Sequence, residues 1–405
     1  MIYHFIAEQT EAGLDFDITL DKDKSVYCFI GENAVGKTNL LENMARSLLY
    51  CHSLFNSHNQ VKYAGVYQHE LVYDAIKSLF LRLAWDVSLN ETKIKDKNKD
   101  KWVVESFNNL INSSVNMTID KPIVFVGAKN RGYTQNINRN HIKILGNNCD
   151  RFLEAFISSF NYMNGKAIEE TEIADWFSSR LIINPNFVTQ NQNCVFEAIT
   201  VLELMQKLEP SFKLITENNG KKELDIKFSD GKLYINSIPI DKLATGIVSL
   251  IKIFQEIIAD YGGWTGFDEK TDLNNVEGIV FIDEIESHLH PKWQSRIISL
   301  LKEFFPNTTF YIATHSPVIV STTDEGEAYE LVREGNKVTA HKLGNPKQWY
   351  LTSVFTQAFH VDFMDSKVRN TPSLISMLKD YSTLVKDYVS GKDEHLKLEA
   401  ESGNG

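Results

Sequence analysis

Residues 31–38 read Gly31-Glu-Asn-Ala-Val-Gly-Lys-Thr38 and fit the G-x-x-x-x-G-K-[ST] pattern of phosphate-binding loops. A strand-forming run, 25–30, precedes this loop, and apolar residues recur every four positions over 39–50, which predicts a helix. A strand, a glycine loop and a helix in this order place phosphate at a helix N-terminus, which a chance glycine turn does not explain. The sequence therefore predicts a nucleotide site with contacts from Asn33, Ala34, Gly36, Lys37, Thr38 and Asn39.

The composition is that of an ordinary soluble globular protein. The chain has 405 residues, enough for two or three folding units, with 43% hydrophobic and 23% charged residues. Apolar runs such as 278–282 are too short to cross a bilayer, and residues 1–5 do not resemble a secretory signal. The four cysteines are scattered without a C-x-x-C pair, so we expect a cytoplasmic protein with no disulfide framework and no membrane partner.

The formal net charge of −11 argues against a protein that coats nucleic acid with its whole surface. A single dense lysine cluster, residues 93–101, leaves room for a local basic face. Its lysines alternate with Asp and Asn, which favours a solvated loop over a tip that contacts phosphate.

A second motif supplies the carboxylates that ATP hydrolysis needs. Residues 279–282 form a continuous apolar run, typical of a strand buried on both faces of a parallel sheet. Asp283 and Glu284 follow at its carboxyl end, where open α/β sheets bind ligands. We expect Thr38 and Asp283 to bind Mg²⁺ and Glu284 to polarise the attacking water. An ordinary buried strand with a capped exit is less favoured, because adjacent carboxylates there are costly unless a cation or solvent meets them.

Two further segments extend this site. Residues 308–314 form another β-rich run, one predicted helix after the carboxylate strand, so His315 is expected at the same sheet edge, close to the γ-phosphate or the water. Thr245 and Gly246 stand before an apolar helix and suit either a plain N-cap or a second phosphate-binding turn. Since one phosphate loop already serves this subunit, such a turn makes most sense against ATP held by another copy.

His288 and His290 allow two interpretations. Their spacing could ligate zinc, but no cysteine or third histidine is close in the sequence, so we favour a contact between subunits.

Together these elements resemble the head of an ABC-type ATPase of the SMC, RecF and OLD group. In that resemblance, 31–38 is the Walker A motif, 241–249 the signature turn, 278–284 the Walker B motif, 287–290 the D-loop and His315 the switch histidine. The string from Gly278 to Gln294 is similar to the PtuA ATPases of Septu and retron anti-phage systems, as is the strand and basic turn of 122–131. The resemblance implies ATP and Mg²⁺ as cofactors, and a partner nuclease of the HNH type.

Two departures from the family pattern bear on hydrolysis more than on ATP binding. Ala244 stands where the signature turn usually has serine, so the contact to the opposing γ-phosphate would fall to Thr245 or to backbone amides. No clear Q-loop glutamine is present, and Gln135 is the candidate.

The expected fold class is α/β: an ABC-ATPase head interrupted by a mainly helical insertion, with no long coiled coil because sustained heptads are missing. Glycine and asparagine turns within 218–231 predict a small antiparallel sheet before the signature turn, with strands at 212–216, 224–228 and 233–235. The expected organisation has four parts: a first part of the ATPase head (1–50), a helical lid (51–210), a β segment with the second part of the head (211–343), and a helical tail whose end is mobile (344–405). Apolar patterns predict helices at 72–85 and 151–162 in the lid and at 349–363 and 371–388 in the tail.

The leading functional hypothesis is an ATP-driven switch, in which two copies trap ATP between each phosphate loop and the opposing Thr245–Gly246 turn. The output would belong to the effector nuclease, and nucleic acid or a retron reverse transcriptase with its DNA are further possible partners. The alternative is a RecF- or OLD-like repair ATPase that binds DNA itself, for which the lysines of 93–101 would matter. A transporter motor is a third hypothesis and has no support in the sequence.

Overall fold

The computed structural model describes residues 1–53, 82–84, 86–95, 117–128, 131–132, 145–146, 148–163, 172–182, 194–212, 215–218, 221–229, 232–265 and 273–361. The chain divides into two compact units, Met1–Gln348 and Trp349–Gly405. In the second unit the structure describes one helix, α10 (Leu351–Phe359), within the predicted helical tail, and the helix predicted over 371–388 lies outside the described residues. All other elements below belong to the first unit.

A ten-stranded mixed sheet organises the first unit, in the order β5-β4-β1-β2-β15-β14-β3-β13-β12-β6. The run from β14 to β6 is parallel, whereas β1, β2, β4 and β5 form an antiparallel extension. The strands are β1 (His4–Glu8), β2 (Asp15–Thr19), β3 (Val26–Ile30), β4 (Asp86–Leu89), β5 (Thr92–Lys95), β6 (Ile123–Val126), β12 (Gly278–Ile282), β13 (Thr308–Ala313), β14 (Ala328–Glu334) and β15 (Lys337–Lys342).

Aromatic side chains stack across the centre of this sheet on one face. The ring of Phe281 lies 6.3 Å from that of Phe125 on β6 and 5.1 Å from that of Tyr311 on β13. Tyr311 in turn stacks on Tyr27 of β3, with ring centroids 5.2 Å apart. These residues stand directly opposite one another in the parallel register, so the ladder fixes the alignment of four neighbouring strands.

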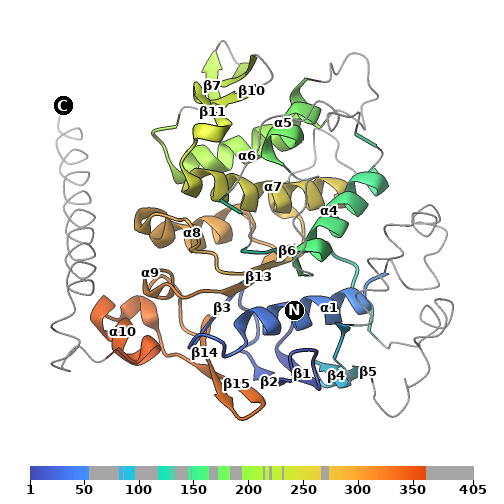
Figure 1. Ribbon diagram of the computed structural model, residues 1–405, viewed down its shortest axis with the longest axis vertical. Helices are drawn as coiled ribbons and strands as arrows, with labels where there is room; N and C mark the ends of the chain where they lie inside the picture. Colours follow the sequence, from blue (N-terminus) through green and yellow to red (C-terminus); the bar gives the residue numbers. More distant parts are fainter. Residues whose placement is uncertain are drawn as a thin grey trace. The chain divides into compact units, whose positions relative to one another are not determined.

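Helices cover both faces of the sheet, which is why its central strands are apolar at every position. The aromatic face packs under α1, and alternate residues such as Cys28 and Ile282 pack under α7 and α8 on the other face (Figure 1). The helices of this unit include α1 (Lys37–Tyr50), α4 (Asn148–Met163), α5 (Ile173–Leu181), α6 (Val195–Leu208), α7 (Thr245–Thr265), α8 (Pro291–Phe304) and α9 (Pro317–Val320). Short 3-10 helices are η7 (Ile240–Lys242), η8 (Leu273–Asn275) and η9 (Pro346–Gln348).

The β segment before α7 differs from its prediction. The sequence predicted one sheet of three strands, but the chain forms two small sheets, β7-β8 and β11-β10-β9. The strand predicted over 224–228 is divided at Asp225, whose carbonyl accepts a hydrogen bond from the backbone N–H of Asn236. The strands are β7 (Ile215–Asn218), β8 (Lys221–Leu224), β9 (Ile226–Ser229), β10 (Lys232–Ile235) and β11 (Ile238–Pro239).

Residues 51–210, expected to be mainly helical, contain α4, α5 and α6 and also contribute strands to the main sheet. β6 pairs in parallel with β12, and β4 pairs with β1. The predicted helix at 151–162 is α4, whereas most of the one at 72–85 lies outside the described residues. The predicted α/β fold class is confirmed, and the described helices include no long coiled coil.

The aromatic ladder gives a test of the fold. Phe281→Ala should lower the free energy of unfolding by about 3–5 kcal/mol, because it removes a fully buried ring and leaves a cavity between two stacked neighbours. Urea denaturation measures this change. Tyr350→Ala is the control, since its side chain is 84% exposed and should change stability by less than about 0.5 kcal/mol. Equal losses in the two variants would contradict the assigned core.

Candidate active site

The three predicted catalytic segments meet at one edge of the sheet. β13 lies between β3 and β12, and all three strands are parallel, so their carboxyl ends point the same way. The phosphate loop follows β3, Asp283 and Glu284 follow β12, and His315 follows β13. Open α/β sheets bind ligands at this edge, where short loops leave strand ends and helix N-termini facing one another.

Both glycines of the phosphate loop are required by their backbone angles and by the space around them. Gly31 and Gly36 have φ angles of 144° and 110°, which side chains rarely adopt. A Cβ on Gly31 would lie 2.8 Å from the carbonyl oxygen of Leu331, and one on Gly36 would lie 2.7 Å from Leu14 Cδ1. The loop is therefore pressed against β14 and β2, and Gly36 caps the start of α1. Asn33 and Ala34 are exposed on its outer side, and Asn39 lies half-buried in the first turn of α1.

Lys37 opens α1 and folds back over the loop. Its buried Nζ donates hydrogen bonds to the carbonyl oxygens of Gly31 and Glu32, at 2.8 and 2.9 Å. Burial lowers the pKa of Lys37 to about 8, although the nearby carboxylates of Glu286, Asp283 and Glu284 act in the opposite direction. The amine is thus held, partly desolvated, where the outer phosphates of a nucleotide would lie.

Thr38 and Asp283 join the two motifs directly. The Thr38 hydroxyl donates to both carboxylate oxygens of Asp283, at 3.1 and 2.9 Å. Burial raises the pKa of Asp283, while the hydrogen bond from Thr38 partly opposes that shift. A hydroxyl and a carboxylate side by side beside a phosphate loop are hard oxygen ligands, which is the donor set that Mg²⁺ takes. These residues therefore fit the predicted metal role.

Glu284 follows Asp283 at the end of β12, and His315 follows β13, the strand between β12 and β3. Glu284 has a φ of 45°, and its carboxylate accepts a hydrogen bond of 3.0 Å from the Ser287 hydroxyl. His315 is exposed at the end of β13. Burial, together with the positive charge of Lys37, lowers the pKa of His315, which favours the neutral imidazole. A neutral imidazole can both donate and accept a hydrogen bond.

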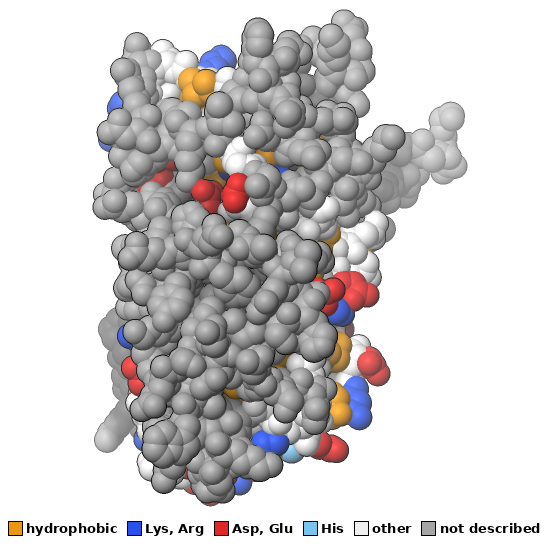
Figure 2. All heavy atoms as spheres, turned by 90° about the vertical axis from the view of Figure 1, so that its right-hand side faces the viewer, with side chains coloured by type: hydrophobic (Ala, Val, Ile, Leu, Met, Phe, Trp, Pro, Cys, Tyr) orange, Lys and Arg blue, Asp and Glu red, His pale blue; other side chains and the backbone are white. Residues whose placement is uncertain are grey.

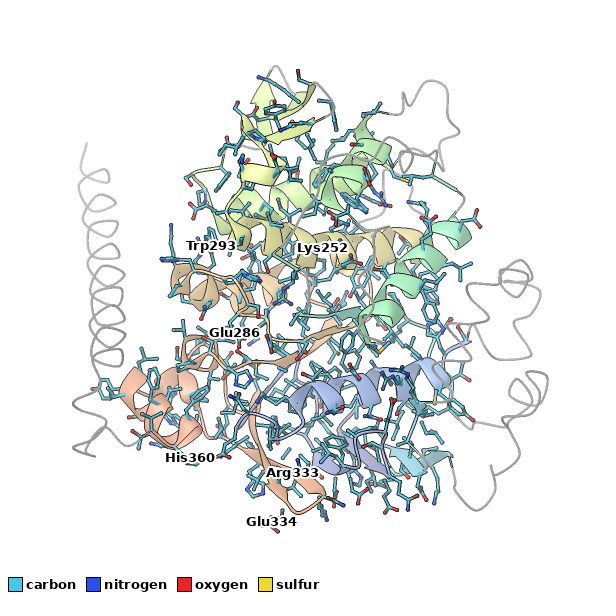
Figure 3. All side chains as sticks on the ribbon, in the orientation of Figure 1. Lys252, Glu286, Trp293, Arg333, Glu334 and His360 are labelled. Carbon is cyan, nitrogen blue, oxygen red and sulfur yellow. The ribbon has the colours of Figure 1, made fainter. Side chains whose placement is uncertain are left out.

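Glu286 is a site residue that the sequence analysis missed. Its carboxylate accepts hydrogen bonds from the His315 backbone N–H at 2.5 Å and from the Thr314 hydroxyl at 2.7 Å. It thus ties the turn after β12, where Figure 3 labels it, to the end of β13. The signal was present in the sequence as a third acidic residue in 283–286, but its partners lie 28 and 29 residues away.

Arg131 is the second residue that was missed, although its turn had been noted after β6. The side chain is fully buried. Its guanidinium donates to the carbonyl oxygens of Gly127, Asp283 and Glu284 and to the hydroxyl of Ser249. Nothing in the local sequence distinguishes this arginine from an exposed basic residue, because its partners come from three separate segments.

Thr245 and Gly246 are the first two residues of α7. Among the residues that the structure describes, neither makes a hydrogen bond to the phosphate loop of its own chain. Thr245 is exposed, and so is Ala244 before it. Gly246 is pressed against the D-loop, since a Cβ there would lie 2.6 Å from the His288 carbonyl oxygen and 2.7 Å from the Trp293 ring.

The other candidate residues are placed as follows. His288 is exposed and its ring lies over Gly132, and the His290 ring caps α8 by accepting from the Lys292 N–H at 3.2 Å. Within the described ranges, no group of three or more His, Cys, Asp or Glu side chains is arranged to hold a metal ion. Gln135 and residues 96–101 of the lysine cluster lie outside the described residues.

Comparisons with known proteins agree with the motifs. Residues 267–321 match a family model described as "AAA domain, putative AbiEii toxin, Type IV TA system". The chain is 27% identical over 186 residues to the Septu protein PtuA of Bacillus thuringiensis, covering 45% of each chain. It is 34% identical over 113 residues to the "Retron Vc95 probable ATPase" of Vibrio cholerae, covering 28% of this chain and 21% of that one. The predicted resemblance to the ATPases of Septu and retron systems is confirmed.

The chain spans less than half the length of these curated relatives. Among solved structures, it matches the Smc head domain of Pyrococcus furiosus with a TM-score of 0.40 and 13% identity, covering 89% of this chain and 98% of that one. It matches cbiO1 of Clostridium perfringens with a TM-score of 0.37 and 13% identity, covering 94% and 100%. No helix in the described part of the chain combines the length and the apolar character needed to span a bilayer.

The buried amine of Lys37 predicts a pH-dependent stability difference. Between pH 8 and pH 10.5 the unfolded chain binds more protons at Lys37 than the folded one, so the cost of burying the charge falls as the pH rises through this window. Lys37→Met removes the charge at every pH. Its gain in unfolding free energy relative to wild type should therefore shrink from pH 7.5 to pH 10, as urea denaturation at each pH would show. A difference that stays constant across this range would contradict the assigned pKa.

Proposed function

We propose that this chain is an ATP-binding and ATP-hydrolysing switch subunit of the ABC type in a prokaryotic anti-phage defence complex. The observation that carries the proposal is the hydrogen bond from Thr38 to Asp283, which joins the phosphate loop to the carboxylate strand. Lys37, Glu284 and His315 lie at the same sheet edge. A site of this kind positions a triphosphate and stabilises developing charge on it, which is most of what phosphoryl transfer requires.

Each residue has a role in converting ATP and water to ADP and phosphate. The loop amides and Lys37 bind the outer phosphates, and Thr38 and Asp283 hold Mg²⁺. The metal neutralises phosphate charge when bound. Glu284 accepts a proton from the attacking water, and His315, kept neutral by its surroundings, hydrogen-bonds the water or the γ-phosphate.

The complete site requires two copies of the chain. Thr245 is exposed at the start of a 21-residue helix and is not bonded to its own phosphate loop. A helix N-terminus with a hydroxyl and a glycine suits the γ-phosphate of a nucleotide held by a second copy. ATP would then hold the two copies together as a dimer, and its hydrolysis would let the dimer dissociate.

The cellular role is inferred from the relatives. The similarity to the Septu protein PtuA and to the retron probable ATPases supports a role in a defence complex. The effector in this proposal is a partner nuclease of the HNH type, which is implied by the resemblance of the motifs to those families. A retron reverse transcriptase with its DNA, or another nucleic acid, is a further candidate partner. We place the complex in the cytoplasm.

The DNA-binding alternative rests on the lysines of 93–101, of which 96–101 lie outside the described residues. Lys93, the first residue of the lysine cluster, pairs with Asp86 at 2.9 Å. On the coloured part of the face in Figure 2, acidic and basic side chains are interspersed and no continuous basic stretch is visible. A steep fall in DNA affinity with salt, lost on neutralising the lysines, would nevertheless favour the repair function.

Glu284→Gln tests the enzyme and the dimer together. It should reduce kcat for ATP hydrolysis by about 100-fold or more, because the water loses its general base. ATP binding should persist, so the variant should elute with ATP and Mg²⁺ at twice the chain mass of 46.3 kDa. Phosphate release and size-exclusion chromatography with light scattering measure the two effects.

Lys37→Met is the matched control, since it should bind no ATP and remain monomeric with or without nucleotide. If Glu284→Gln has the same mass with ATP as without it, the dimer model is wrong.

A second prediction concerns the effector. When the chain is purified together with an HNH nuclease that binds it, cleavage of plasmid DNA should differ between the wild-type complex with ATP and the Glu284→Gln complex locked with ATP. The reason is that the nuclease responds to the nucleotide state of the dimer and not to ATP itself. The control is a nuclease variant that lacks its catalytic histidine. Equal cleavage in both complexes would contradict the proposal that this chain controls the nuclease.

A further inference from the structure

A series of hydrogen bonds runs from the signature helix to the catalytic carboxylate. Ser249, in the second turn of α7, donates through its hydroxyl to the carbonyl oxygen of Ser287, at 3.1 Å. The hydroxyl of Ser287 then donates to the carboxylate of Glu284, at 3.0 Å. The proposed base is thus held by a serine whose own backbone is held by α7.

Arg131 is bonded at both ends of this series. Its Nε donates to the Ser249 hydroxyl at 3.0 Å, and one terminal nitrogen donates to the Asp283 carbonyl oxygen at 2.9 Å. The other terminal nitrogen donates to the carbonyl oxygen of Glu284. The rigid, planar guanidinium fixes the geometry of these three acceptors relative to one another, which a flexible lysine amine cannot do.

The segment that Arg131 holds is strained and tightly packed. Glu284 and His288 have φ angles of 45° and 69°, which non-glycine residues adopt only when their surroundings enforce them. The turn from 284 to 290 is closely packed on two sides. A Cβ on Gly132 would lie 2.7 Å from the His288 ring, and a Cβ on Gly246 would lie 2.6 Å from the His288 carbonyl oxygen. A displacement at the start of α7 must therefore move this turn as well.

We propose that Arg131 and Ser249 are positioning residues that couple the start of α7 to the orientation of the Glu284 carboxylate. The inference rests on the proposed function, in which the opposing ATP engages Thr245 and Gly246. That engagement fixes the first turns of α7. The hydrogen bonds through Ser249 and Ser287 then orient the Glu284 carboxylate toward the attacking water. Each subunit would then hydrolyse its own ATP only while its signature turn is occupied.

Ser249→Ala is the principal test, because it removes one buried hydroxyl with almost no change in volume. We expect kcat for ATP hydrolysis to fall by about 10–100-fold, since misplacing a catalytic group has effects of that order. KM and the Kd for ATP should stay within about 2-fold of wild type, because the phosphate loop and the metal ligands are untouched. Ser299→Ala is the control: its hydroxyl also donates to a backbone carbonyl oxygen, that of Arg296 at 3.0 Å, but at an exposed position on α8.

Arg131→Lys and Arg131→Met provide the second arm. Both should lower kcat at unchanged Kd for ATP, and Met more than Lys. When either arginine variant is combined with Ser249→Ala, kcat should fall little further than in the more impaired single variant, because the residues act through the same carboxylate. A melting temperature near that of wild type shows that each variant folds, and if an arginine variant does not fold, Ser249→Ala decides alone.

Different results would overturn the coupling and the ATPase activity. Wild-type kcat in Ser249→Ala, or a raised Kd for ATP at unchanged kcat, would overturn the coupling and leave the ATPase proposal standing. Hydrolysis by Lys37→Met at the wild-type rate would instead overturn the ATPase proposal.

Discussion

The hydrogen bond between the Thr38 hydroxyl and the Asp283 carboxylate joins residues separated by 245 positions in the sequence, and the architecture of the first unit serves to make it. Neither residue could reach the other if β3 and β12 were not on either side of β13 in parallel register. The aromatic ladder of Phe125, Phe281, Tyr311 and Tyr27 fixes that register from within the core. A shift along any of these strands would separate the hydroxyl from the carboxylate.

The same edge concentrates charges that water would otherwise solvate. Lys37 and Asp283 are both buried. Burial lowers the pKa of Lys37 and raises the pKa of Asp283, so in each case it favours the neutral form. The structure limits the cost by giving each group hydrogen-bond partners within the chain. A triphosphate and a divalent cation carry charges opposite to those of the lysine and the aspartate. Their binding would therefore compensate the two buried charges.

Local motifs carried much of the argument from the sequence, because the phosphate loop and the carboxylate strand are contiguous segments with characteristic spacing. The strand and helix around 31–38 and the strand before Asp283 are found at nearly the expected bounds. The residues that connect segments escaped prediction for the opposite reason. Arg131 and Glu286 reveal their roles only through partners that the fold brings from elsewhere. At the division between β8 and β9, Asp225 is bonded to Asn236, a partner that the turn composition does not indicate.

The strand order affects how the chain can fold while it is synthesised on the ribosome. β3, which leads into the phosphate loop, pairs only with β13 and β14 in the described sheet, and these are synthesised some 280 residues later. Until then the nascent chain carries an apolar strand with unsatisfied edges, which is a state prone to aggregation. Such non-local pairing slows folding, because the entropy of closing a long loop is lost before any contact compensates for it. The ribosome must therefore synthesise the chain through β14 before β3 can pair on both sides, and a product truncated before β13 would leave both edges of β3 unpaired.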